Sequence, residues 1–132
     1  MRRLVIVAFV LPLLAGCFSS SPTANEGGGP ARLVPSWVRD ENLPPRAIPG
    51  ANLYAGLGCA ACHTYDGSGS SSLGAPDLTA IGSRKLGIRF QIAHLMCPSC
   101  VNPGSPMPDS AALGRKRLRQ LAIFLEASKG TR

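Results

Sequence analysis

The feature that most constrains this 132-residue chain is the run Cys-Ala-Ala-Cys-His at residues 59–63. Two thiols at this spacing, followed at once by an imidazole, can bond to one edge of a porphyrin and supply a ligand to its iron. A chain this short has room for one small domain, and such domains usually need a cofactor, a metal or a disulfide for stability. The run therefore predicts one covalent haem c, with Cys59 and Cys62 as thioether sites and His63 as an axial ligand.

Two other kinds of site also use a Cys-x-x-Cys pair. A thioredoxin-like redox disulfide belongs in a βαβ pattern, and no strand of convincing alternation surrounds this motif. A zinc site needs two further ligands, which Cys97 and Cys100 could supply with the same spacing. The motif alone leaves the zinc site open.

Three side chains are candidates for the second axial ligand of a haem iron. Met107 lies between Pro106 and Pro108, in a loop whose rigid backbone could present the thioether. Met96 falls on the apolar face of a predicted helix, so core packing is its expected role. His94 is a weaker candidate, because a histidine in such a position more often forms hydrogen bonds or lies at the surface than binds iron. We expect Met107 to be the ligand, and His–Met ligation raises the reduction potential relative to two nitrogen ligands.

A backbone acceptor for His63 is predicted in the stretch Gly-Ala-Pro-Asp-Leu at residues 74–78. An axial histidine usually donates its other ring N–H to a carbonyl or carboxylate, which fixes its tautomer and orientation. Pro76 stiffens this stretch, which offers such a carbonyl to His63.

The first residues resemble an export signal. A positively charged start is followed by an apolar run at 4–14, which is shorter than a membrane span needs. The run Leu-Ala-Gly-Cys at 14–17 is similar to the bacterial lipobox, in which the cysteine is lipidated and becomes the first residue. We expect a signal peptide at 1–16 and a lipid on Cys17, although an ordinary signal peptide or an uncleaved anchor would leave similar patterns. The expected location is a bacterial membrane, with the domain facing the periplasm or the cell exterior.

Residues 17–48 are rich in Pro, Gly and Ser, which predicts a flexible tether. About 30 residues of such chain have an end-to-end distance of roughly 30 Å, so the domain could reach neighbouring proteins while it stays at the membrane. The more apolar segment 33–38 could lie along the domain or bind a partner. The domain itself is expected at 49–132.

Apolar periodicity predicts three helices, over residues 51–58, 88–96 and 115–128. The last is the clearest, because Leu118, Leu121 and Leu125 fall on one stripe. Pro98 is expected to end the second helix, and Gly130 to stop the third. Loops are expected over residues 63–76 and 102–109.

Together these motifs resemble class I monohaem cytochromes c. The resemblance covers about residues 49–129 and is carried by Gly50 and Tyr54, the 59–63 motif, the 74–78 stretch, Pro-Gly-Ser-Pro-Met-Pro at 103–108, and the last helix. It implies an all-α fold of short helices around one covalent haem, with crossed N- and C-terminal helices. Gly50 would allow these helices to approach closely, and Tyr54 would pack near Phe124 or Leu125.

The resemblance also implies a ligand set. His63 and Met107 would be the axial ligands, with the Pro76 carbonyl on His63. The pair His94-Leu95 resembles one that is common in this helix among the family, which argues further against His94 as a ligand.

Cys97 and Cys100 depart from the family pattern, which usually has an acidic residue before the proline at this point. In an oxidising compartment a spare pair should form a disulfide. A redox-active pair would want its first cysteine at a helix N-terminus, whereas Cys97 falls at a predicted C-terminus. We expect a structural disulfide that closes a tight loop ahead of Met107; a redox-active or partner-linked pair is the alternative.

The chain carries a formal net charge of +7, and loss of Arg2 and Arg3 with a signal peptide would leave 12 basic and 7 acidic side chains. This charge, with few aromatic residues, does not indicate nucleic acid; an acidic protein partner or an anionic membrane surface fits better. Basic residues crowd the start of the last helix, where the helix dipole favours acidic ones. They form either a solvated face or a docking patch: Arg115, Lys116, Arg117 and Arg119.

The expected function is single-electron transfer, by a free carrier or by a subunit of a respiratory or photosynthetic complex. With His63 and Met107 both bound, the iron has no open position, and we expect no enzymatic activity. A peroxidase, or a sulfur-compound oxidoreductase using Cys97 or Cys100, would need a displaceable axial ligand. A gas or redox sensor, or a haem-bearing structural subunit, is a third class. Helical-bundle gas-binding cytochromes carry their motif near the C-terminus, whereas here it is central.

Overall fold

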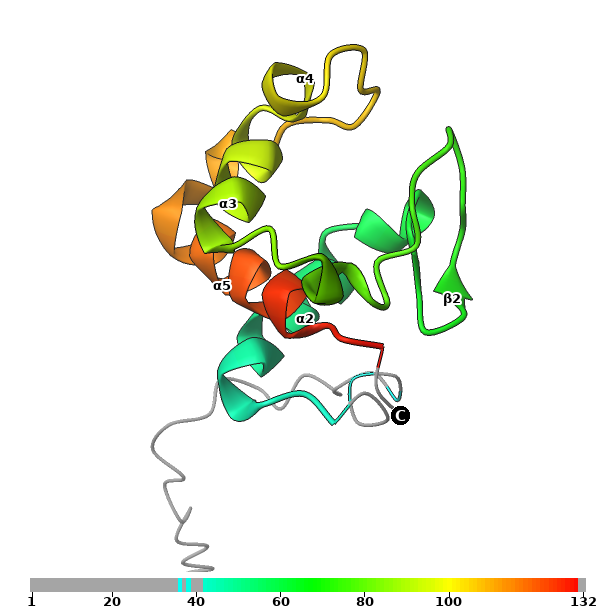
Figure 1. Cartoon of the computed structure of the whole chain (residues 1–132), viewed down its shortest axis with the longest axis vertical. Helices are drawn as coiled ribbons and strands as arrows, with labels where there is room; N and C mark the ends of the chain where they lie inside the picture. Colours follow the sequence, from blue (N-terminus) through cyan, green and yellow to red (C-terminus); the bar gives the residue numbers. More distant parts are fainter. Residues whose placement is uncertain (1–35, 37, 39–41, 131–132) are drawn as a thin grey trace, which may run out of the picture.

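The structure is a computed structural model that describes residues 36, 38 and 42–130. It is mostly helical, with one two-stranded sheet (Figure 1). The α-helices are α2 (Ile48–Gly56), α3 (Ile88–Met96), α4 (Pro98–Val101) and α5 (Gly114–Ala127). Four 3-10 helices connect them: η1 (Pro45–Ala47), η2 (Cys59–Ala61), η3 (Ile81–Arg84) and η4 (Ala111–Leu113). The expectation of a small helical fold is confirmed.

A short β-hairpin corrects the expectation that the fold is all helical and that 63–76 is loop. β1 (Thr64–Tyr65) pairs antiparallel with β2 (Ser68–Gly69). Between them Asp66 and Gly67 both have positive φ, 47° and 71°. Asp-Gly is a strong signal for such a tight turn, but strands of two residues are too short to show an alternating pattern.

The first and last long helices of the described domain cross at a glycine. A Cβ at Gly50 would lie 2.0 Å from the Gln120 carbonyl oxygen and 2.6 Å from the Phe124 Cβ. One turn later, the Tyr54 ring lies 5.5 Å from the Phe124 ring, centroid to centroid. The close approach of α2 and α5 at Gly50 and the packing of Tyr54 on Phe124 are therefore confirmed.

The aromatic centre of the core joins the hairpin to the end of α5. Tyr65 is fully buried, and its ring centroid lies 5.0 Å from that of Phe124. Its hydroxyl donates to Ser128 Oγ at 2.8 Å, and the buried Ser128 hydroxyl donates to the Phe124 carbonyl at 2.9 Å. These polar atoms are satisfied within the core, which avoids the cost of burying them alone.

The packed part of the chain begins before residue 49. Val38 and Ala47, which lie in the range predicted as tether, are 1% and 0% exposed and belong to the core. At Val38, at least, the apolar segment 33–38 packs on the domain. The predicted signal peptide and Cys17 lie outside the described residues. Among the residues described, no helix combines the length and apolarity needed to cross a bilayer.

Candidate haem site

The Cys-x-x-Cys-His motif forms a tight turn at the end of α2. Gly58 takes a left-handed conformation with φ 79°, which turns the chain out of α2 and into η2. The amides of Cys62 and His63 then donate to the Cys59 carbonyl, at 3.2 and 3.0 Å. The turn brings the two cysteines and the histidine together as one unit.

Both motif cysteines are free thiols and half-buried. Burial raises the pKa of Cys59, and the neighbouring Cys62 raises it further, against a backbone hydrogen bond that lowers it. A raised pKa keeps the thiol protonated at neutral pH, whereas reactive redox cysteines have lowered pKa values. This environment argues against a thioredoxin-like active site.

The ring of His63 is fixed by the predicted carbonyl. His63 Nδ1 lies 2.9 Å from the Pro76 carbonyl oxygen. Because a carbonyl only accepts, Nδ1 must carry the proton, and the lone pair of a neutral ring is on Nε2. Nε2 of a histidine held in this way is a common metal ligand.

A network of polar contacts that the sequence reading missed holds the Pro76 segment in place. Asp77 accepts from the Thr64 hydroxyl and from the Thr79 amide, both at 2.7 Å. The hydrogen bonds from Thr79 and Thr64 lower the pKa of the Asp77 carboxyl, against a smaller effect of burial. An aspartate that bonds a backbone amide two residues later is a known turn pattern, so Asp77 and Thr79 carried a readable signal.

The backbone of His63 is enclosed as well as its ring. The Tyr54 hydroxyl donates to the His63 carbonyl at 3.3 Å. On another side, a Cβ at Gly69 would lie 2.4 Å from the same carbonyl oxygen, so the hairpin packs directly on it. The motif is therefore held by α2, by the hairpin and by the 74–79 segment.

Met107 lies in a separate loop that is tied at both ends. The Asn102 amide donates to the Pro98 carbonyl at 2.8 Å, and the Ser110 amide donates to the Leu95 carbonyl at 2.8 Å. Met107 is half-buried and packs against the edge of the core. Among the described residues, no hydrogen bond connects the 102–110 loop to the 59–63 motif.

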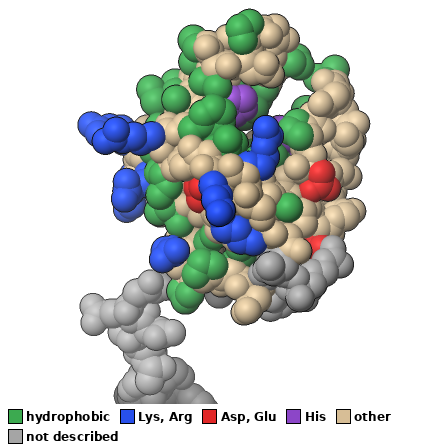
Figure 2. All heavy atoms as spheres, viewed as in Figure 1, with side chains coloured by type: hydrophobic (Ala, Val, Ile, Leu, Met, Phe, Trp, Pro, Cys, Tyr) green, Lys and Arg blue, Asp and Glu red, His purple; other side chains and the backbone are tan. Residues whose placement is uncertain are grey.

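Figure 2 shows a hollow between α4, at one end of the molecule, and the segment that carries the hairpin, which is coloured green in Figure 1. Histidine side chains (purple) lie at the wall of this hollow. Burial lowers the pKa of His94, with a smaller electrostatic contribution from His63 in the same direction. His94 stacks parallel to Phe90, with 6.1 Å between ring centroids.

Met96 is 46% exposed, so the expectation that it packs in the core is wrong.

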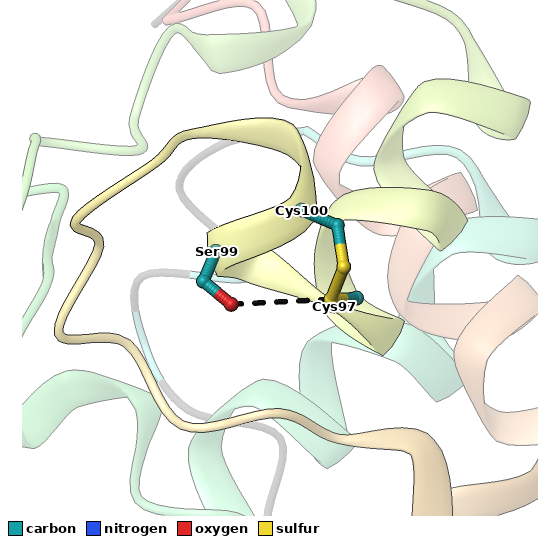
Figure 3. The surroundings of a disulfide bond; sticks show 3 residues. All are labelled: Cys97, Ser99 and Cys100. Carbon is teal, nitrogen blue, oxygen red and sulfur yellow. Dashed lines mark hydrogen bonds between the residues drawn. A yellow bond between two sulfur atoms is a disulfide. The ribbon is translucent and has the colours of Figure 1, made fainter.

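Cys97 and Cys100 form the expected disulfide between the end of α3 and α4 (Figure 3). Their Cα atoms are 5.2 Å apart, and Cys97 Sγ has a weak contact with Ser99 Oγ at 3.9 Å. Sulfurs bonded to each other cannot act as the thiolate ligands of zinc, so this pair does not complete a zinc site with the motif. The described residues contain no group of three or more His, Cys, Asp or Glu side chains arranged to hold a metal ion.

The predicted basic patch is exposed along the first turns of α5, which contain no acidic residue. Its members are Arg115, Lys116, Arg117 and Arg119. On the face shown in Figure 2, Lys and Arg side chains predominate over Asp and Glu.

Comparisons of the chain with protein families, with curated protein sequences and with solved structures gave no match.

Proposed function

We propose that this chain is a class I monohaem cytochrome c, which transfers single electrons while tethered to a bacterial membrane by a lipid on Cys17. The observation that carries the proposal is the 2.9 Å contact of His63 Nδ1 with the Pro76 carbonyl, directly after a Cys-x-x-Cys turn. A disulfide role for the motif gives no reason for an imidazole positioned in this way, and the Cys97–Cys100 disulfide removes the further thiolates that a zinc site could have used.

The residues fit a covalent haem c in their chemistry. Cys59 and Cys62 are unpaired and partly exposed, as thioether formation requires. His63 keeps its Nε2 lone pair for iron, and Met107 is a half-buried thioether in a loop held at both ends. When bound, the haem supplies a one-electron iron couple.

The protein's own part is to hold ligands and exclude competing chemistry. The Pro76 carbonyl keeps the Nδ1 proton in place, which orients the ring and makes Nε2 a stronger donor. Asp77 holds the segment that contains Pro76 in place through its hydrogen bonds with Thr64 and Thr79. The haem iron would be held by His63 and Met107, which would leave it no position for a substrate, so a carrier is favoured over an enzyme.

The proposed partners are redox proteins or a membrane electron-transport complex. The exposed basic residues at the start of α5 would meet an acidic surface, which speeds association in a salt-dependent way. Export completes the proposal, because the Cys97–Cys100 disulfide suits an oxidising compartment, and lipidation of Cys17 would supply the anchor.

The test is production of the whole chain in a bacterium that has a c-type maturation system. We expect an intact mass increased by one haem that denaturation does not remove, and reversible one-electron reduction. A matched Cys59→Ser, Cys62→Ser variant should be exported without haem. A wild-type chain that is exported and folded but retains no haem under denaturing conditions would overturn the proposal. The mass of its N-terminal peptide tests lipidation of Cys17 separately.

A further inference from the structure

A groove of about 510 Å³ lies between η1, the start of α3 and the C-terminal half of α5. Its apolar lining includes Ile88 and Ile123. Three basic side chains also line it, Arg46, Arg119 and Lys129, together with one acidic side chain, Glu126. Its size is within the range of sites that take one small molecule.

The charge of this groove is unbalanced. Glu126 Oε1 already accepts a hydrogen bond from Gln91 Nε2 at 2.9 Å, and Lys129 Nζ donates to the Gly82 carbonyl. Arg46 and Arg119 are exposed, and neither has a carboxylate partner within the described part of the chain. Two guanidinium groups beside an apolar lining favour a ligand with a phosphate at one end and hydrocarbon at the other.

The position of the groove identifies the source of that ligand. Pro44 and Arg46, in the first continuous stretch of the described chain, line the groove, so the groove lies at the N-terminal end of the described domain. Figure 1 shows the segment around residues 42–48 at the opposite end of the domain from α4, beside which the hollow of Figure 2 lies. A lipid anchor on Cys17 would therefore bring this end close to the bilayer.

We propose that this groove binds the phosphate of an anionic phospholipid through Arg46 and Arg119, with Ile88 and Ile123 against its glycerol and upper acyl groups. Binding would hold the domain with its hollow turned away from the membrane. The inference rests on the proposed lipid anchor and not on the proposed haem. An acidic protein is a weaker fit, because a folded surface would have to enter a groove with room for a single headgroup.

The test uses the chain from residue 17 with Cys17→Ser, whether or not it carries haem, so that no acyl chain contributes to binding. Co-sedimentation is measured with vesicles of phosphatidylcholine alone and of phosphatidylcholine mixed with phosphatidylglycerol, and protein is quantified by staining. We expect binding to the anionic vesicles only, weakened about tenfold or more in Arg46→Glu, Arg119→Glu, since each basic residue near an anionic surface contributes about 1 kcal/mol. Arg84→Glu, Lys85→Glu is the matched control, with the same charge change at exposed positions that neither line the groove nor belong to the basic patch on α5.

Three results would overturn the proposal: no binding to anionic vesicles, equal binding to neutral ones, or equal losses in the two variants. Inorganic phosphate could instead raise the temperature of unfolding of the wild type but not of the Arg46, Arg119 variant. Together with an absence of vesicle binding, that result would identify a free phosphate ligand. Circular dichroism checks that each variant folds. If the Arg46→Glu, Arg119→Glu variant does not fold, the charge-neutralising variant Arg46→Gln, Arg119→Gln takes its place. Failure of haem attachment would leave the stained vesicle result unaffected, so the two proposals fail separately.

Discussion

Gly50 of α2 lies so close to Gln120 of α5 that a Cβ at position 50 would lie 2.0 Å from the Gln120 carbonyl oxygen. The obstacle is backbone, and it cannot swing away as the end of a flexible side chain could. The crossing of α2 and α5 is therefore specified by the absence of one methyl group, and the positions of Tyr54 and the motif after it depend on that crossing.

Gly50→Ala should lower the free energy of unfolding by about 3 kcal/mol, at the upper end of the usual cost of overpacking, because the two helices must separate. Chemical denaturation followed by circular dichroism measures this. Ala55→Ser, at an exposed position on the same helix, should change stability by less than about 0.5 kcal/mol. Similar losses in both variants would mean that the crossing tolerates a side chain.

Asp77→Asn should destabilise the domain in a pH-dependent way. The hydrogen bonds from Thr79 and Thr64 lower the pKa of Asp77 in the folded state. Its ionised form therefore stabilises the fold above the unfolded pKa of about 3.9, and this contribution is lost as the pH falls through the lower folded value. The gap in unfolding free energy between wild type and variant should narrow below about pH 4. A gap that stays constant from neutral to acid pH would contradict the role of the charge.

Cys97→Ser with Cys100→Ser should leave haem attached but loosen Met107. The disulfide joins the end of α3 to α4, directly ahead of the 102–110 loop. Closing so short a loop restricts the unfolded chain only slightly, so the main effect is on local rigidity. The near-infrared Met–iron band and the reduction potential report the change, with Ser99→Ala as a control. An unchanged band and an unchanged potential would refute this role of the disulfide.

Met107→Ala should open the iron to exogenous ligands. We expect the reduced wild-type protein not to bind carbon monoxide at neutral pH, and the variant to bind it. Met96→Ala changes an exposed methionine and should behave as wild type. Carbon monoxide binding gained in His94→Gln instead would make His94 the ligand.

Arg115→Ala, Lys116→Ala, Arg117→Ala should slow electron exchange with an acidic redox protein at low salt. The exposed patch would speed encounter electrostatically, and salt screens that effect. Stopped-flow rates for wild type should fall with salt, whereas those of the variant should change little. If wild-type rates are equal at low and high salt, the patch is a solvated face and not a docking surface.

The sequence was most informative where one residue type has one physical consequence. The apolar period predicted α3 at its observed bounds and α5 within one residue at each end. The resemblance to class I monohaem cytochromes c predicted the contact of the Pro76 carbonyl with His63 and the helix crossing at Gly50. In each case the residue that the sequence pattern favours at that position is also the one that the packing of the domain requires.

The remaining differences arise where short segments depend on their surroundings. Pro98 was expected only to end a helix, yet it also begins α4, because proline fits the first turn of a helix. Met96 lies at a helical period from Ile92, yet it is 46% exposed, whereas Leu95 in the same turn is buried in the core. The contacts of Asp77 with Thr64 join segments whose proximity depends on the fold of the hairpin.

The hydrogen bond between Tyr65 and Ser128 spans 63 residues of sequence and lies at the centre of the core. A chain that crosses a membrane from its N-terminus delivers Cys59 and Cys62 long before it delivers α5. Until α5 arrives, Tyr54 and Tyr65 lack Phe124, and the core around the motif cannot close. If the chain is exported and carries haem as proposed, the order of export would therefore deliver both motif thiols before the helix that closes the core around them.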